Sequence, residues 1–160
     1  MSERIASLEF KVEKHASMTV AGLAERYTGS TAKNIPLLWQ RFGPFIGSIP
    51  GQTGKCAYGV KRGWDDRDNS FEYISGWEVK PGAQHMPDFT YVDIPAQTYL
   101  VFTHRGQAST IRNTCDIIWE EFFPQSKYEP SQGPEFELYD ERFDPETNSG
   151  ITELWIPIKA

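Results

Sequence analysis

The sequence predicts an α+β protein in which two β-β-α-β-β repeats, related by a pseudo-twofold axis, share an antiparallel sheet with two helices on one face. Three observations support this fold class. The 160 residues are 39% hydrophobic and 14% aromatic, which suits a single globular domain with a sizeable core. Segments with period-two alternation flank two segments with helical periodicity. The same order of segments recurs after roughly 80 residues.

The first repeat spans about residues 8–80. Its helix is predicted from apolar residues at spacings of three and four, namely Ile35, Leu38, Trp39 and Phe42. Pro36 fits only the first turn of such a helix. We expect strands at Glu9–Lys14, Met18–Thr28, Lys55–Lys61 and Phe71–Val79, a helix at Ala32–Phe42, a loop at Gly43–Gly54 and a charged turn at Arg62–Asn69.

The second repeat spans about residues 88–159, so the single domain takes in nearly all of residues 1–160. Its helix has the clearest apolar stripe in the chain, and Trp119 lies in the middle of that stripe, which predicts that it is a core residue. We expect strands at Phe89–Asp93, Gln97–His104, Gly133–Asp140 and Ile151–Ile158, and a helix at Ser109–Phe123.

Two amphipathic helices on one twisted sheet bury their stripes only against shared strands, and ligand sites favour the cleft at such a junction. In the strand that follows Gly133, Phe136 and Leu138 share one face, while Glu135, Glu137 and Tyr139 share the other. A Glu that faces water would be unremarkable. If its face borders a cavity, however, a carboxylate beside aromatic rings would bind an organic cation.

Composition excludes several classes of function. The formal net charge of −6 and pI near 5.1 argue against direct binding to nucleic acid. Cys56 and Cys115 are far apart and lack metal-ligand spacing, so we expect no metal and no cofactor. No apolar run could cross a bilayer, and the N-terminus lacks the apolar region of a signal peptide. We therefore expect a cytoplasmic protein that does not bind membranes.

Two stretches resemble the signatures of GyrI-like domains. Ile94–Tyr99, followed by Gly106, is similar to the motif that opens the second repeat of that family. Gly133–Tyr139, closing on Glu153–Lys159, is similar to its C-terminal motif. The resemblance covers nearly the whole chain, from about residue 8 to the end. It implies a duplicated α+β effector-binding domain of the type used by bacterial AraC-type and multidrug-sensing transcription regulators.

In the drug-sensing members, a Glu of the C-terminal motif lies at the base of an aromatic pocket and neutralises lipophilic cations. Glu137 matches that position, and Tyr139 matches the accompanying aromatic residue. We therefore expect a small-molecule effector-binding protein whose ligands are hydrophobic cations. Only about eight residues precede the domain, so we expect a free-standing member that lacks its own DNA-binding domain. The candidate ligand-binding residues are Glu137, Tyr139, Trp39, Phe45, Tyr58, Trp77 and Tyr91.

Other interpretations remain open at this point. Trp39 fits core packing as well as it fits a pocket. Some GyrI-like proteins are hydrolases of electrophilic small molecules, and Glu137 with Tyr139 would supply the general base and its partner. Other members bind DNA gyrase, so the protein partners to consider are a separate transcription regulator, gyrase or a second copy in a homodimer. The sequence offers no hydrolase or P-loop motif, and we expect a binding protein rather than an enzyme.

Overall fold

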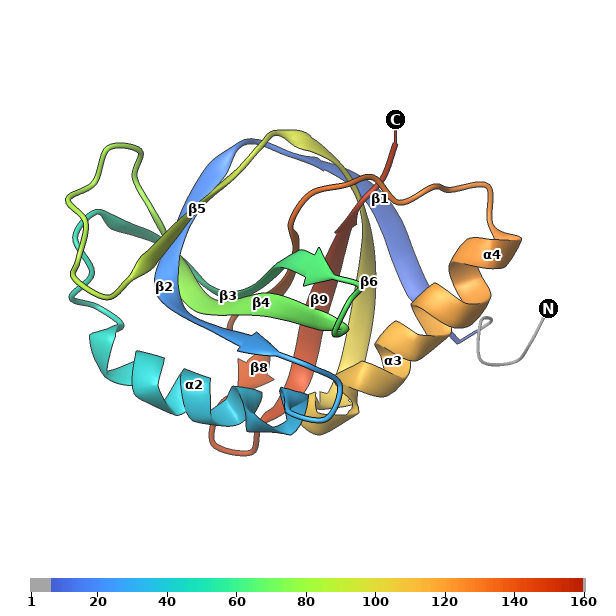
Figure 1. Ribbon diagram of the computed structural model, residues 1–160, viewed down its shortest axis with the longest axis horizontal. Coiled ribbons are helices and arrows are strands. Elements are labelled where there is room, and N and C mark those ends of the chain that lie inside the picture. The colour runs from blue at the N-terminus through green and yellow to red at the C-terminus, as the bar shows by residue number, and fades with distance from the viewer. Residues whose placement is uncertain (1–6, 160) are drawn as a thin grey trace.

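The computed structural model describes residues 7–159. Figure 1 shows a strongly curved sheet with α2 (Ile35–Phe42) along the bottom of the view and α3 (Ile111–Ile117) at the lower right. The strands are β1 (Glu9–His15), β2 (Met18–Tyr27), β3 (Gln52–Asp65), β4 (Ser70–Val79), β5 (Thr90–Ile94), β6 (Gln97–Gln107), β7 (Glu135–Tyr139), β8 (Phe143–Asp144) and β9 (Ser149–Pro157). The helices are α2 (Ile35–Phe42), α3 (Ile111–Ile117) and α4 (Phe123–Gln125), with 3₁₀ turns at Ala32–Asn34, Gly43–Phe45 and Ala108–Thr110 and a π-helical turn at Ile118–Phe122.

The strand order is symmetric about the centre of the sheet. It reads β1-β6-β9-β7-β3-β4-β2-β5, and the short β8 pairs with β9 outside this path. All of these ladders are antiparallel. The pseudo-twofold axis therefore lies between β7 and β3, with one repeat on each side. The first strand of each repeat crosses over, since β1 pairs with β6 and β5 pairs with β2.

Both helices cover the same face of the sheet, as predicted. The two repeats each supply a hydrophobic cluster beneath their helix, around Phe42 in one and Phe122 in the other. A third cluster fills the opposite face, where β1, β2, β5 and β6 curve over the centre (Figure 1). Along β7 the two faces alternate, so Phe136 and Leu138 join this third cluster. The neighbouring residues of β7 consequently face the helices.

Several elements differ in length from the predictions. β3 continues to Asp65 through the charged stretch predicted as a turn, because Arg62 pairs with Glu72 across the β3–β4 ladder. The second helix is interrupted by the π-helical turn. Trp119 lies in that turn and is 40% exposed, so the prediction of a core position was wrong. The irregular turn breaks the spacing of three and four that placed Trp119 in the apolar stripe.

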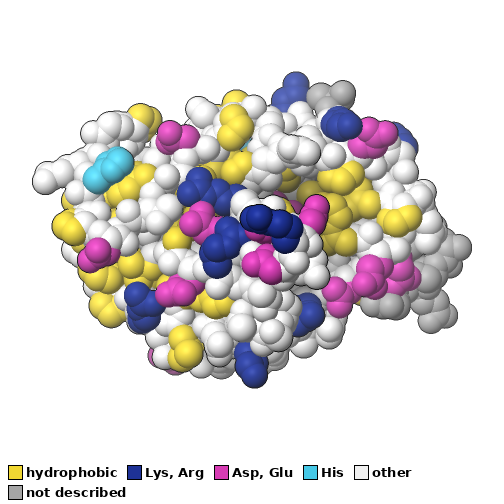
Figure 2. Space-filling view, in the orientation of Figure 1, with side chains coloured by type: hydrophobic (Ala, Val, Ile, Leu, Met, Phe, Trp, Pro, Cys, Tyr) yellow, Lys and Arg dark blue, Asp and Glu magenta, His cyan; other side chains and the backbone are white. Residues whose placement is uncertain are grey.

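The surface above the β3–β4 hairpin is mixed in charge. In Figure 2, basic and acidic side chains are interspersed near the middle of the drawn face. The ion pairs Arg62–Glu72 and Arg67–Asp65 belong to this hairpin. Among the described residues, none of the helices has the length and apolar character needed to cross a membrane.

Candidate functional site

Glu137 lies at the centre of the sheet, beside the pseudo-twofold axis. It is opposite Gly59 of β3 on one side and Leu154 of β9 on the other. Only 7% of its surface is exposed. Because its neighbours on β7 face away from the helices, the Glu137 side chain faces the helices. A carboxylate in this position needs partners, since burying a charge without them is costly.

Two tyrosine hydroxyls hold the Glu137 carboxylate, and an indole donates to one of those hydroxyls. Tyr73 Oη and Tyr139 Oη each donate to Glu137 Oε1 at 2.8 Å. Trp39 Nε1 of α2 donates in turn to Tyr73 Oη at 3.0 Å. The Trp39 ring also packs edge-on against Tyr139, with centroids 5.5 Å apart. These contacts link α2, β4 and β7 through one polar network within an aromatic setting.

Gly59 makes this network possible. A Cβ atom at position 59 would lie 2.1 Å from Tyr73 Oη and 2.8 Å from Glu137 Oε1, which is closer than atoms can approach. Because glycine has no Cβ atom, Gly59 leaves the space in which the Tyr73 hydroxyl and the Glu137 carboxylate meet. This is the close approach to backbone for which glycine is suited.

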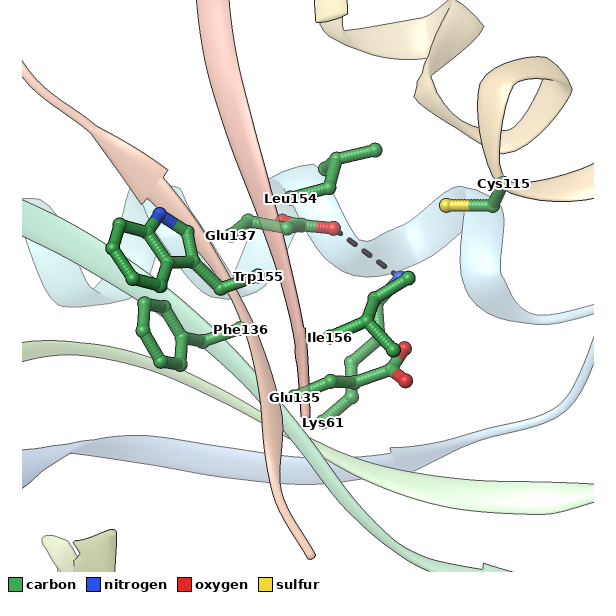
Figure 3. Close-up of a pocket in the computed structure, with 8 residues that line it drawn as sticks. All are labelled: Lys61, Cys115, Glu135, Phe136, Glu137, Leu154, Trp155 and Ile156. Carbon is green, nitrogen blue, oxygen red and sulfur yellow. Dashed lines mark ion pairs between the residues drawn. The ribbon is translucent and has the colours of Figure 1, made fainter. Parts of the chain in front are cut away.

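Lys61 neutralises the second oxygen of Glu137. Its Nζ lies 3.3 Å from Glu137 Oε2, and the two side chains are 16% and 9% exposed. Figure 3 shows the Lys61 ammonium facing the Glu137 carboxylate, with Cys115 pointing toward the pair from α3. The rings of Phe136 and Trp155 lie together and point away from the pair. Glu137 thus has a cation as its partner, and that cation belongs to the protein itself.

Burial and charge shift the pKa values of the surrounding groups. Burial raises the pKa of both Tyr73 and Tyr139 well above the usual range, and the Glu137 charge adds to this, so both phenols stay protonated and donate. Burial lowers the pKa of Lys61, but Cys115, Glu137 and Glu135 together outweigh it, and the ammonium keeps its proton. Burial raises the pKa of Glu135, which Lys61 only partly offsets.

Cys115 is a poor nucleophile in this setting. Burial raises the pKa of its thiol to about 11, and the nearby Lys61 charge opposes that rise without cancelling it. Since the thiolate is the reactive form, the thiol at neutral pH is largely inert. Among the described residues there is also no group of three or more His, Cys, Asp or Glu side chains that could hold a metal ion.

The hollow at the ion pair is small. Its volume is about 10 Å³, enough for about one water molecule. A larger surface hollow of about 410 Å³ lies at the bends that precede β2 and β6, where Lys14, His15, Ala16, Ala96, Gln97 and Thr98 line it. The hollow at Glu137 is lined by Lys61, Cys115, Glu135, Phe136, Glu137, Leu154, Trp155 and Ile156.

The structure brings together three of the residues named from the sequence, namely Glu137, Tyr139 and Trp39. Trp77 lies on the same face, separated from Tyr139 by Ala57, and its Nε1 donates to the Thr53 carbonyl at 2.9 Å.

The other three candidates lie elsewhere. Tyr58 is on the opposite face of the sheet, in the cluster that contains Phe136. Phe45 and Tyr91 are partly buried and pack against the hydrophobic cluster that contains Phe42. Phe45 contacts Phe89, and Tyr91 stacks on His85.

Sequence reasoning missed three residues of the site: Lys61, Tyr73 and Gly59. Tyr73 alternates with Trp77 on a strand face of mixed polarity, which was a usable signal. Gly59 interrupts a strand between Tyr58 and Val60, and an isolated glycine there often marks a close approach. Lys61 stood at the predicted end of its strand and carried no signal, because its pairing with Glu137 depends on the β3–β7 register.

Comparison with known proteins places the chain in a family. The model of the GyrI-like small molecule binding domain matches residues 8–159. The chain belongs to the GyrI-like family. It is also 30% identical over 157 residues to the transcriptional regulator BrlR of Pseudomonas aeruginosa, a match that covers 97% of this chain and 57% of BrlR. The chain therefore spans little more than half the length of that regulator.

Solved structures show the same GyrI-like fold. The structure of SAV2435 bound to tetraphenylphosphonium is similar, with a TM-score of 0.71 at 20% identity, covering 95% of this chain and 94% of that one. An integron cassette protein from the mobile metagenome of Vibrio cholerae, VCH_CASS2, has a TM-score of 0.67 at 19% identity, covering 96% of this chain and 99% of that one. The predicted sheet with two helices is confirmed by these likenesses.

Proposed function

We propose that this GyrI-like domain binds lipophilic organic cations at Glu137, with Tyr139, Tyr73 and Trp39 as the aromatic wall. The observation that carries the proposal is a carboxylate at the centre of the sheet that is only 7% exposed and is held by two phenol hydroxyls. The likeness to a protein bound to tetraphenylphosphonium supports this choice of ligand class.

The chemistry of the site suits a cation without hydrogen-bond donors. Hydrogen bonds to a charged group contribute about 1.5–3 kcal/mol each, so the two hydroxyls fix the carboxylate in place. A cation over an aromatic ring gains about 0.5–2 kcal/mol, and more when water is excluded. Glu137 supplies the charge, and the rings of Trp39 and Tyr139 supply the apolar contact.

Binding requires the site to open. The present hollow of about 10 Å³ is far below the roughly 300–1,000 Å³ of small-molecule sites. Side chains that now meet over Glu137, Lys61 among them, have to separate before an organic cation can reach the carboxylate.

The test is a calorimetric titration of tetraphenylphosphonium into the wild type and Glu137→Gln. We expect the variant to lose about 100-fold in affinity, since truncating a buried charged partner costs 2–5 kcal/mol or more. Glu141→Gln is the matched control, because Glu141 is exposed and follows the same strand. Neutral triphenylphosphine oxide should bind the wild type much more weakly than the cation does. Equal affinity of wild type and Glu137→Gln for the cation would refute the proposal.

A second variant guards against misfolding. Glu137→Gln removes the carboxylate that Lys61 contacts in the free protein, which is expected to lower stability. The double variant Lys61→Met, Glu137→Gln removes both charges, so its thermal unfolding should lie closer to that of the wild type. Loss of cation binding in this double variant would then report on Glu137 rather than on folding.

The wider role stays a prediction. A separate transcription regulator or gyrase as protein partner, a homodimer and a cytoplasmic location are all expectations from the sequence. The hydrolase alternative also places its chemistry at Glu137, and it predicts turnover of an electrophilic ligand that Glu137→Gln abolishes.

A further inference from the structure

We propose that Lys61 occupies, in the free protein, the place at Glu137 that a bound cation takes, and that binding transfers Lys61 to Glu135. The inference rests on the proposed function of the same site. Its first support is position, since Lys61 Nζ lies 3.3 Å from Glu137 Oε2, the oxygen that neither tyrosine contacts. Lys61 therefore acts as an internal competitor of the ligand and sets how strongly a cation must bind to enter.

Space at the site supports displacement rather than simultaneous binding. The hollow beside the ion pair has a volume of about 10 Å³. Lys61 and Glu137 both line it, so an organic cation cannot approach Glu137 Oε2 while the ammonium remains there. The ligand and Lys61 consequently exclude each other at this oxygen.

The charge count of the hollow favours one additional cation. Of its eight lining residues, three have charged side chains: Lys61, Glu135 and Glu137. Two carboxylates thus face one ammonium. At Glu135, burial raises the pKa of the carboxyl and the Glu137 charge adds to that rise, although Lys61 opposes it. A monovalent cation at Glu137 and Lys61 at Glu135 would give each carboxylate a partner.

The register of the strands makes the transfer a local movement. Lys61 of β3 is directly opposite Glu135 of β7, whereas Glu137 lies two residues farther along β7. Directly opposite side chains have Cβ atoms about 4.5–5.5 Å apart, and diagonal ones are more distant. Lys61 therefore reaches diagonally to Glu137 in the free protein. Rotation within its long side chain brings it to its direct partner without a change in the backbone.

The first experiment compares the affinity for tetraphenylphosphonium of the wild type, Lys61→Met and Lys61→Arg. Lys61→Met keeps the length of the chain but removes the competing charge, so affinity should rise at least about tenfold. Lys61→Arg keeps the charge and should bind no more tightly than the wild type. Lys55→Met on the same strand is the matched control, because Lys55 is exposed, and it should leave affinity nearly unchanged. In a Glu137→Gln background, the effect of Lys61→Met should disappear.

The second experiment observes Lys61 directly in the wild type. A buried, ion-paired ammonium exchanges slowly enough for its ¹H–¹⁵N signal to be followed by NMR, and Lys61→Arg assigns the signal. Saturation with tetraphenylphosphonium should shift that signal to a new position, and Glu135→Gln should weaken cation binding severalfold by removing the alternative partner. An unchanged signal in the saturated protein would overturn the transfer.

The outcomes separate the two proposals. Binding that depends on Glu137 but is equal in the wild type and Lys61→Met would overturn the role of Lys61 and leave the proposed function standing. If Lys61→Met binds the cation and the wild type does not, the result would support competition between Lys61 and the ligand for Glu137. Failure of every variant with an intact Glu137 to bind the cation would refute the proposed function and, with it, the inference.

Discussion

The two repeats have equivalent frames but unequal chemistry. Trp39 and Trp119 lie at corresponding positions, each three residues before a phenylalanine of the core, Phe42 or Phe122. Trp39 donates to Tyr73 and packs on Tyr139, whereas Trp119 is 40% exposed and contacts Phe123 at 4.9 Å. The first helix donates a hydrogen bond to the Glu137 network, whereas the second helix covers its own half of the sheet and adds the Cys115 side chain to the lining of the hollow.

The difference is clearest at the axis itself. Gly59 and Glu137 are paired across the junction of the two repeats. A strictly symmetric protein would have a carboxylate at both positions, and two buried like charges side by side are strongly unfavourable. One repeat therefore supplies the carboxylate while the other supplies the space for it. A single buried carboxylate on the pseudo-twofold axis therefore requires that the two repeats differ at this position.

The largest effect on stability is expected from filling the space beside Gly59. Gly59→Ala places a Cβ atom against Tyr73 Oη and Glu137 Oε1, so we expect a loss of about 2–3 kcal/mol in the free energy of unfolding. Chemical denaturation measures it. Gly43→Ala is the control, because its Cβ would meet nothing within 4 Å and its φ is negative. Equal stability of the two variants would contradict the role given to Gly59.

The unequal tryptophans offer a second, smaller test. Trp39→Phe removes the donor to Tyr73 and part of a packed ring, and should lower the free energy of unfolding by about 1–2 kcal/mol. Trp119→Phe changes an exposed side chain and should stay within about 0.5 kcal/mol of the wild type. Urea unfolding of both variants under the same conditions decides the comparison. Similar losses would mean that the helices contribute equally.

The smallest effect concerns Glu135, whose counterpart in the first repeat is the uncharged Ala57. Burial raises the folded-state pKa of Glu135 above its ordinary value of 4.5, so its contribution to stability is complete at low pH and is lost as pH rises through the folded pKa. Glu135→Gln should therefore unfold at a higher temperature than the wild type at neutral pH. The difference should vanish near about pH 4.

Thermal scans of Glu135→Gln at both pH values test this sign. Glu141→Gln serves as the control, because an exposed carboxyl should show no such dependence on pH. A variant less stable than the wild type at neutral pH would mean that Glu135 is already fully paired with Lys61.

Much of the fold followed from patterns within single segments. Alternation located the strands, and spacing of three and four located both helices, because each pattern records one face that must be buried. The π-helical turn escaped prediction since no residue type marks it. The extension of β3 through Arg62 escaped for a similar reason, because charged residues that pair across a ladder resemble the charged residues of a turn.

Fewer residues of the candidate site than elements of the fold could be predicted from the sequence. Glu137 and Tyr139 lie within one strand and match a family motif, so they could be named. The side of the sheet that Tyr58 faces depends on how β3 is placed against β7, and alternation alone does not specify which face meets the helices. The partnership of Lys61 with Glu137 joins residues 76 positions apart through that same register.

The crossed strands at the ends of the sheet also bear on how the protein folds. Each repeat pairs its first strand with the other repeat, so that Glu9 is opposite Thr103 and Met18 is opposite Ile94. Contacts between residues so distant in the chain make folding slow, because long loops close before they are stabilised. An isolated repeat would also lack a partner for its first strand. Two such half-length chains would regain that pairing by exchanging their first strands, as the two repeats of the single chain do.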